Sequence, residues 1–165
     1  MKKYDKPDQR LMAIWAADCV ERVLPFFEQT YPHDDRPRTA IEVCRTWVRT
    51  GIFKMAEIRS ASLAAHAAAR HAKADGHHAA CFAARAAGQA VGTAHVAQHA
   101  FGGALYALKA IAAADPARTK TEVAKEHDWQ AQHIATSLRP EFLKRVIVQE
   151  RTSGMFVTVQ KDEDF

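Results

Sequence analysis

Glycine and proline are scarce in this sequence, at 7 and 6 of 165 residues. These two residues are the poorest helix formers, whereas alanine, the best one, accounts for 33 residues. The composition therefore argues against a β-sandwich, a collagen-like chain and a disulfide-stabilised scaffold. Because hydrophobic residues make up 48%, it also argues against a disordered chain. A chain of this length is expected to form one domain with its own core.

The short motifs of several large enzyme classes are also absent. The sequence contains no G-x-x-x-x-G-K-[ST] phosphate loop, no G-x-G-x-x-G dinucleotide turn and no G-x-S-x-G nucleophile elbow. Nucleotide hydrolysis, Rossmann-type redox chemistry and α/β-hydrolase chemistry are therefore unsupported. We assign no catalytic residue from the sequence and expect a binding protein rather than an enzyme.

Cysteine is used sparingly and without pairing. Cys19, Cys44 and Cys81 form no C-x-x-C motif and each lies in a hydrophobic run, a pattern typical of a reducing compartment. The N-terminus has no apolar core of signal-peptide length, and the alanine-rich stretch 79–114 carries too many polar residues for a membrane span. We therefore expect a protein of the bacterial cytoplasm with no membrane attachment.

Charge of one sign does not dominate, because 23 basic residues face 19 acidic ones and the isoelectric point is near 9.1. Arg38, Arg45 and Arg49 lie at helical spacing, but Glu42 interrupts the stripe. We interpret this stripe as a solvated face, with a surface for an acidic partner or polyanion as the alternative. Only the isoelectric point favours nucleic acid, so nucleic acid is not an expected partner.

Apolar residues recur at helical spacing along most of the chain. The pattern predicts helices over about residues 8–29, 34–50, 55–74, 77–114 and 119–138. Pro25 should kink or end the first helix, and the fourth should break near Gly92–Thr93 or Gly102–Gly103. Thr119 and Glu122 have the spacing of a capping box. A shorter helix through Val146 and Ile147 should follow Pro140.

We therefore predict an all-α fold, a single-domain helical bundle of about five to six helices with an alanine-rich, close-packed core. The helical domain spans residues 8–150, and residues 151–165 form a C-terminal tail. Within this tail, the apolar and β-branched residues 155–159 favour a short strand or a segment packed on the bundle.

Several polar residues stand in apolar helical segments, where an unpaired polar group is costly. Asp18 follows the run Trp15–Ala17, and its simplest partner is Arg22, one helical turn later. The alternative is a site carboxylate that faces the histidines. His66 lies among alanines, one turn before Arg70, and is expected to form an interhelical hydrogen bond.

His95 and His99 have the H-x-x-x-H spacing that places two imidazoles one helical turn apart. Two such nitrogens can share a metal ion, and Asp18 or His66 could complete a site for zinc or another divalent metal. We expect, however, that the two histidines are hydrogen-bonded within a helix interface and that no cofactor is bound, with the metal site as the alternative.

Small residues recur beside these histidines. Gly88, Gly92 and Gly103 fall on the same helical face, which predicts a close helix–helix seam. Trp129 and His133 form one further pair of neighbours on a helix face. The complete candidate polar cluster is Asp18, Arg22, His66, Arg70, His95, His99, Trp129 and His133.

Six short segments follow one another along the chain in the order of a known family. They are Trp15–Pro25 (WAADCVERVLP), Asp34–Arg38 (DDRPR), Ala64–Arg70 (AAHAAAR), Ala86–Gly88 (AAG), Thr93–Ala100 (TAHVAQHA) and Glu126–Gln130 (EHDWQ) with His133. Together they resemble a small bacterial family, the Imm-5-like immunity proteins, over about residues 10–135. The stretch after Pro140 lies outside the resemblance.

The resemblance implies a protein that binds and neutralises a toxin domain stoichiometrically, without catalysis. Its partner would be that toxin domain, and self-association into a homo-oligomer is compatible with it. The alternative function follows from the residues themselves: a helical metal-binding protein or small metalloenzyme that uses His66, His95, His99 and Asp18.

Overall fold

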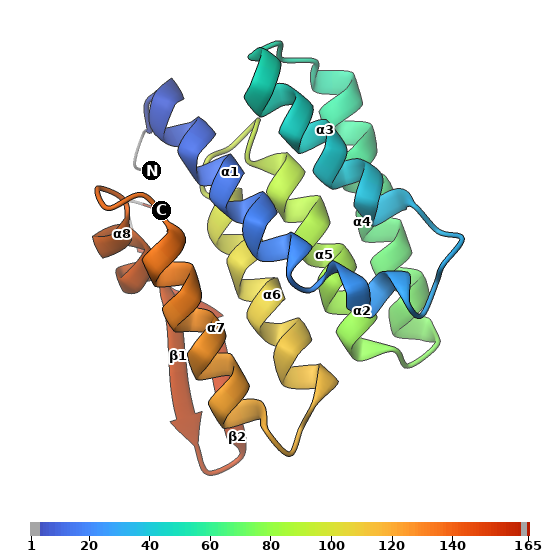
Figure 1. Ribbon diagram of the computed structural model, residues 1–165, viewed down its shortest axis with the longest axis vertical. Coiled ribbons are helices and arrows are strands. Elements are labelled where there is room, and N and C mark those ends of the chain that lie inside the picture. The colour runs from blue at the N-terminus through green and yellow to red at the C-terminus, as the bar shows by residue number, and fades with distance from the viewer. Residues whose placement is uncertain (1–3, 163–164) are drawn as a thin grey trace.

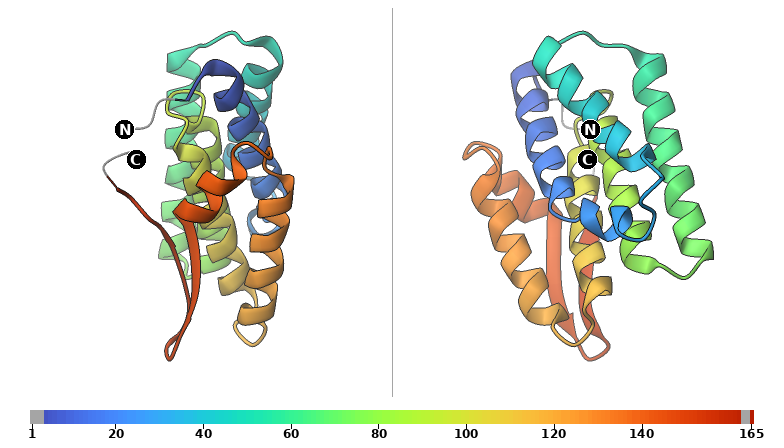
Figure 2. Two further views of the ribbon diagram at one scale, coloured as in Figure 1. Left: turned by 90° about the vertical axis from the view of Figure 1, so that its left-hand side faces the viewer. Right: turned by 45° about the vertical axis from the view of Figure 1, so that its right-hand side comes forward.

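The computed structural model describes residues 4–162 and 165, which form eight helices and one antiparallel hairpin. The elements are α1 (Lys6–Glu21), α2 (Leu24–Glu28), α3 (Arg36–Thr50), α4 (Met55–Ala74), α5 (His78–Gly92), α6 (His99–Ala114), α7 (Thr119–His133), α8 (Arg139–Arg145), β1 (Val146–Arg151) and β2 (Gly154–Val159). The helices pack side by side, and the hairpin runs along α6 and α7 (Figure 1, Figure 2). The all-α bundle class is confirmed, although five to six helices was too few.

Two of the additional helices come from breaks in the longer helices expected from the sequence. The first breaks after Glu21, and Pro25 then occupies the first turn of α2, where its missing N–H is not needed. The second breaks after Gly92, one of the two expected places. At this break the buried side chain of Gln9 donates to the carbonyl oxygens of Thr93 and Ala94, at 2.8 and 3.1 Å. Helix α1 thus satisfies carbonyls that the end of α5 leaves free.

The centre of the bundle is α5, which contacts α1, α2, α3, α4 and α6 (Figure 1). Alanine dominates the buried residues, as expected, and lets helices approach closely. A Cβ added at Gly103 of α6 would lie only 3.7 Å from the Ala86 carbonyl oxygen of α5. Larger side chains fill the space beside α7 and α8, where Trp15 meets Phe101 and Phe142 edge-on.

Two local predictions were wrong. Thr119 and Glu122 form no capping box: Arg118 is the N-cap residue of α7, and the Thr119 hydroxyl donates to the Ala112 carbonyl instead. Val146 and Ile147 are not helical, because their β-branched side chains begin β1, which pairs with β2 in register Val146 to Val159. Residue 150 is where the sequence analysis ends the helical domain and begins the C-terminal tail. The hairpin pairs residues from both sides of that boundary. None of the helices in the described residues is long and apolar enough to cross a membrane.

Candidate functional site

The structure distributes the eight candidate polar residues over three places. They are Asp18 between α1 and α3; Arg22, Trp129 and His133 between α1 and α7; and His66, Arg70, His95 and His99 on α4, the turns after α5 and the start of α6. The candidates therefore form no single cluster.

Asp18 has a different partner from the one expected. Its carboxylate accepts a hydrogen bond from Arg45 Nη2 at 2.6 Å, and the same nitrogen contacts Glu21 at 2.8 Å. Arg45 reaches Asp18 because α3 packs beside α1, a contact that residue spacing within one helix does not show. Asp18 is therefore part of an ion pair between helices and does not face the histidines.

Arg22 instead joins α1 to α7. Its Nε lies 3.0 and 2.9 Å from the two carboxylate oxygens of Glu126. The guanidinium also covers the Trp129 ring, with the central carbon 4.0 Å from the ring centroid, and Trp129 stacks on His133. Arg22, Trp129 and His133 thus meet as a charged and aromatic contact between two helices.

Glu126 is the member of this contact that the sequence analysis did not identify. Its side chain is 4% exposed, and burial raises the pKa of its carboxyl, whereas the hydrogen bond from Arg22 acts to lower it. One signal in the sequence could have found it, since Glu126 lies one helical turn before Trp129 and two before His133. The same helix face therefore carries all three residues.

The histidines lie against the glycines of α5. A Cβ added at Gly88 would be 2.8 Å from His66 Nε2, and one added at Gly92 would be 3.2 Å from His99 Cδ2. The Ser62 hydroxyl of α4 also donates to the Gly88 carbonyl at 2.9 Å. Glycine at these two positions thus lets α4 and α6 place imidazole rings directly on the α5 backbone.

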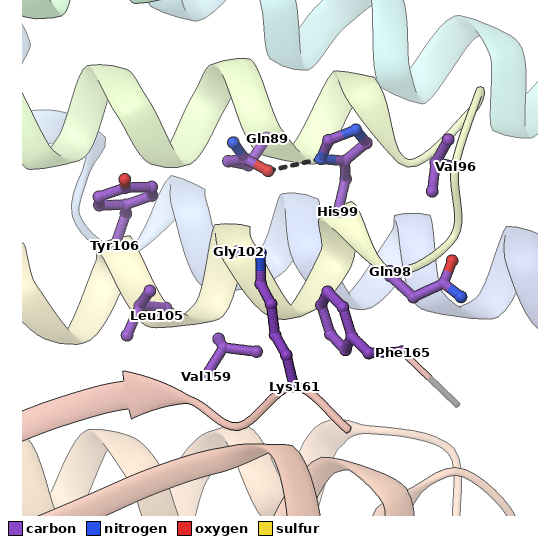
Figure 3. A pocket seen from close by; sticks show the side chains of 10 residues that line it. All are labelled: Gln89, Val96, Gln98, His99, Gly102, Leu105, Tyr106, Val159, Lys161 and Phe165. Carbon is purple, nitrogen blue, oxygen red and sulfur yellow. Dashed lines mark hydrogen bonds between the residues drawn. The ribbon is translucent and has the colours of Figure 1, made fainter. Parts of the chain in front are cut away.

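His95 and His99 do not share a helix. His95 lies exposed in the turns after α5, and His99 is the first residue of α6. The Nδ1 atom of His99 lies 2.7 Å from the Gln89 side-chain oxygen (Figure 3). The break that ends α5 therefore separates two imidazoles that the H-x-x-x-H spacing would otherwise align.

Burial lowers the pKa of both half-buried histidines. Neighbouring cations lower it further: Arg85, Arg70 and His99 act on His66, and His95 and Lys161 act on His99. The side chains that shift these two pKa values electrostatically are thus all Arg, Lys or His, and none is a carboxylate. Both imidazoles are favoured in the neutral form at neutral pH.

Two open cavities lie on either side of His99. One, of about 280 Å³, lies between α6 and the C-terminal residues, where Tyr106, Lys161 and Phe165 line it (Figure 3). The other, of about 340 Å³, lies between α4 and the turns after α5, with Arg59 and Leu63 on its wall. A larger cavity, of about 510 Å³, lies beside the candidate residue Arg22 and Glu126.

The residues proposed as metal ligands are only partly brought together. His66, His95 and His99 are electrostatic neighbours, while Asp18 is held by Arg45. Within residues 4–162 and 165, no three His, Cys, Asp or Glu side chains gather in a way that could hold a metal ion. Metal binding stays a prediction, which the metal content of untagged protein purified without chelator would test.

Comparison with known proteins gives one match. No curated protein and no solved structure matches the chain. A sequence model of the family described as Imm-5 like putative immunity protein matches residues 2–137. That segment contains α1 to α7, whereas α8 and the hairpin follow it. The protein thus belongs to the Imm-5 like putative immunity protein family.

Proposed function

We propose that this protein is an immunity protein of the bacterial cytoplasm that binds a toxin domain and neutralises it by occupying its surface. The observation that carries this proposal is the family match over residues 2–137, which includes all seven helices from α1 to α7. The helical bundle, rather than the hairpin, is then the part that binds the toxin.

The packing of the bundle supports this function. Close contacts among alanine and glycine residues hold α4, α5 and α6 together, so side chains on their surface start from fixed positions. A partner that binds a pre-organised surface loses less conformational entropy, which favours a tight complex. Neutralisation by binding also needs no catalytic residue in this chain.

The test is a titration of a candidate toxin domain from the organism that encodes this protein. Toxin activity should fall linearly with added protein and vanish at a ratio of about one to one, because each molecule blocks one toxin. If the protein were an enzyme that inactivates the toxin, a small amount of it would abolish the activity of a molar excess of toxin over time. A toxin domain from an unrelated system serves as the control.

Co-expression in cells gives the matching biological readout. Cells that make the toxin domain should survive only when this protein is made with it. Continued killing, together with no complex on size-exclusion chromatography, would show that the proposed function is wrong.

A further inference from the structure

The net charge of this protein is concentrated in one part of the chain. Residues 58–114 contain five Lys or Arg and a single acid, Asp75, whereas the rest of the chain contains 18 basic and 18 acidic residues. Helices α4, α5 and α6 with the turns between them, residues 55–114, carry five basic residues against Glu57 and Asp75, and thus +3 of the formal charge of +4. Asp75, at the end of α4, accepts a hydrogen bond from Tyr31 and contacts His71.

We assign four of these five basic residues, all except Lys73, to one surface. We define the cationic face as Arg59, His66 and Arg70 of α4, Arg85 of α5, and Tyr106 and Lys109 of α6. Arg70 and Arg85 are both electrostatic neighbours of His66. Arg85 and Lys109 both approach the Tyr106 ring, at 5.6 and 5.8 Å from its centroid.

Within residues 4–162 and 165, the cations of this face have no acidic partner. Among the described residues, Arg59, Arg70, Arg85 and Lys109 form no ion pair with a carboxylate. Like charges that lie close together repel, and the repulsion is relieved when a partner brings acids to them. The face is thus complementary in charge to an acidic surface.

Apolar side chains next to the cations favour a protein surface over nucleic acid. Met55 and Leu63, on the same side of α4 as Arg59, are 43% and 57% exposed. Protein interfaces combine an apolar centre with a polar rim and are enriched in Arg, Tyr and Met, whereas binding of nucleic acid is dominated by phosphate contacts.

We propose that the cationic face is the surface that receives an acidic patch of the toxin domain. This inference rests on the proposed function and specifies the chemistry of the partner. Tyr106, Met55 and Leu63 supply contact area, and the arginines supply attraction that accelerates association and fixes orientation.

The test compares two triple charge reversals with the same net change. The face variant carries Arg59→Glu, Arg70→Glu and Arg85→Glu. The control variant carries Arg118→Glu, Lys120→Glu and Lys125→Glu, whose side chains lie near or on α7 and are 71%, 71% and 67% exposed. Circular dichroism and thermal unfolding check that both variants fold like the wild type.

Binding to the toxin domain is then measured for all three proteins at low and at physiological salt. We expect the face variant to lose at least about 100-fold in affinity, with a slower association that no longer depends strongly on salt. The control should change by less than about 5-fold because its charges lie elsewhere. A Leu63→Asp variant should weaken binding without changing the cations.

Each other outcome contradicts a specific statement. Tight binding by wild type and face variant alike would place the toxin elsewhere and leave the immunity function intact. No binding by the wild type would overturn the immunity function, and with it this inference. Salt-sensitive binding of duplex DNA or RNA that the face variant loses, with toxin binding unchanged, would assign the face to nucleic acid instead.

Discussion

The arginines of α3 and those of α4 and α5 occupy contrasting surroundings. On α3, Arg38 pairs with Glu28, and Arg45 pairs with both Asp18 and Glu21. On α4 and α5, Arg70 and Arg85 lie near other cations and pair with no carboxylate of the described residues. The same residue type therefore connects helices in one region and remains available to a partner in the other. An arginine stripe in a sequence cannot be interpreted until the acids that neighbouring helices bring to it are known.

The largest effect should come from the most buried paired cation. Arg145 is 1% exposed and contacts Glu141 at 2.7 Å and the carboxylate of Asp162. Arg145→Ala should lower the free energy of unfolding by about 3 kcal/mol, since it leaves carboxylates beside a site that has lost its cation. Urea unfolding measures this. The control Lys144→Ala, whose side chain is 51% exposed, should cost less than about 0.5 kcal/mol.

A second comparison sets one arginine from each region side by side. Arg22→Ala should cost about 2 kcal/mol because Glu126 is buried, although Arg22 itself is 42% exposed and water replaces part of the interaction. Arg85→Ala should change stability by less than about 0.5 kcal/mol, because no ion pair is broken. Equal losses in the two variants, seen in urea unfolding, would remove the contrast between the regions.

The histidines should make the stability depend on pH. The pKa of His66 and of His99 in the folded protein lies below the ordinary value of 6.5, so the unfolded chain binds more protons as pH falls through that value. The free energy of unfolding should therefore be largest above pH 7 and decrease as pH falls through 6.5 towards the lowered values. The decrease should level off once pH lies below both folded pKa values.

Unfolding midpoints at about pH 7.5 and about pH 5.5 measure this dependence. The double variant His66→Gln/His99→Gln should show a smaller difference between the two conditions. The raised pKa of Glu126 acts in the opposite direction, but closer to the ordinary carboxyl value of 4.5. A wild-type midpoint that does not move between the two conditions would contradict the shifted histidines.

The smallest effect concerns the seam between α4 and α5. A methyl group at Gly88 would occupy the place of the His66 ring, so Gly88→Ala should push the imidazole outward into water. The pKa of His66 should rise towards 6.5, as an NMR titration would measure, while His99, which packs on Gly92, serves as the internal control. The free energy of unfolding should change by less than about 1 kcal/mol. The higher helix propensity of alanine, worth up to about 1 kcal/mol relative to glycine, offsets the cost of displacing the His66 ring.

Sequence periodicity predicted the helices well because alanine-rich segments with few glycines and prolines have one strong local preference. The end of α3 at Gly51 and the break after Gly92 could both be predicted, because each is marked by a glycine in the local sequence. The hairpin was only half expected: β2 has a strand-like sequence, but β1 follows α8 without a turn residue. Its strand state depends on pairing with β2, which is not a local property.

The polar residues were harder to predict because their partners come from other helices. Trp129 and His133 were found as helix neighbours, and the structure stacks their rings. Asp18 and Arg22, also neighbours along one helix, instead bind Arg45 and Glu126 from elsewhere in the chain. The metal hypothesis relied on similar reasoning: it aligned His95 and His99 on one helix, although the break predicted near Gly92 places His95 in the turns after α5 and His99 at the start of α6.

The buried cysteines have a practical consequence for labelling. Cys19, Cys44 and Cys81 are the only cysteines of the sequence and all three are buried. Burial raises the pKa of Cys44 to about 12 and that of Cys19 well above its ordinary value. Because the thiolate is the reactive form, Cys19 and Cys44 react slowly with alkylating reagents, and burial shields the Cys81 sulfur from them. A cysteine placed at the exposed position of Leu63 would accept a fluorophore or spin label selectively, while the native thiols stay in place.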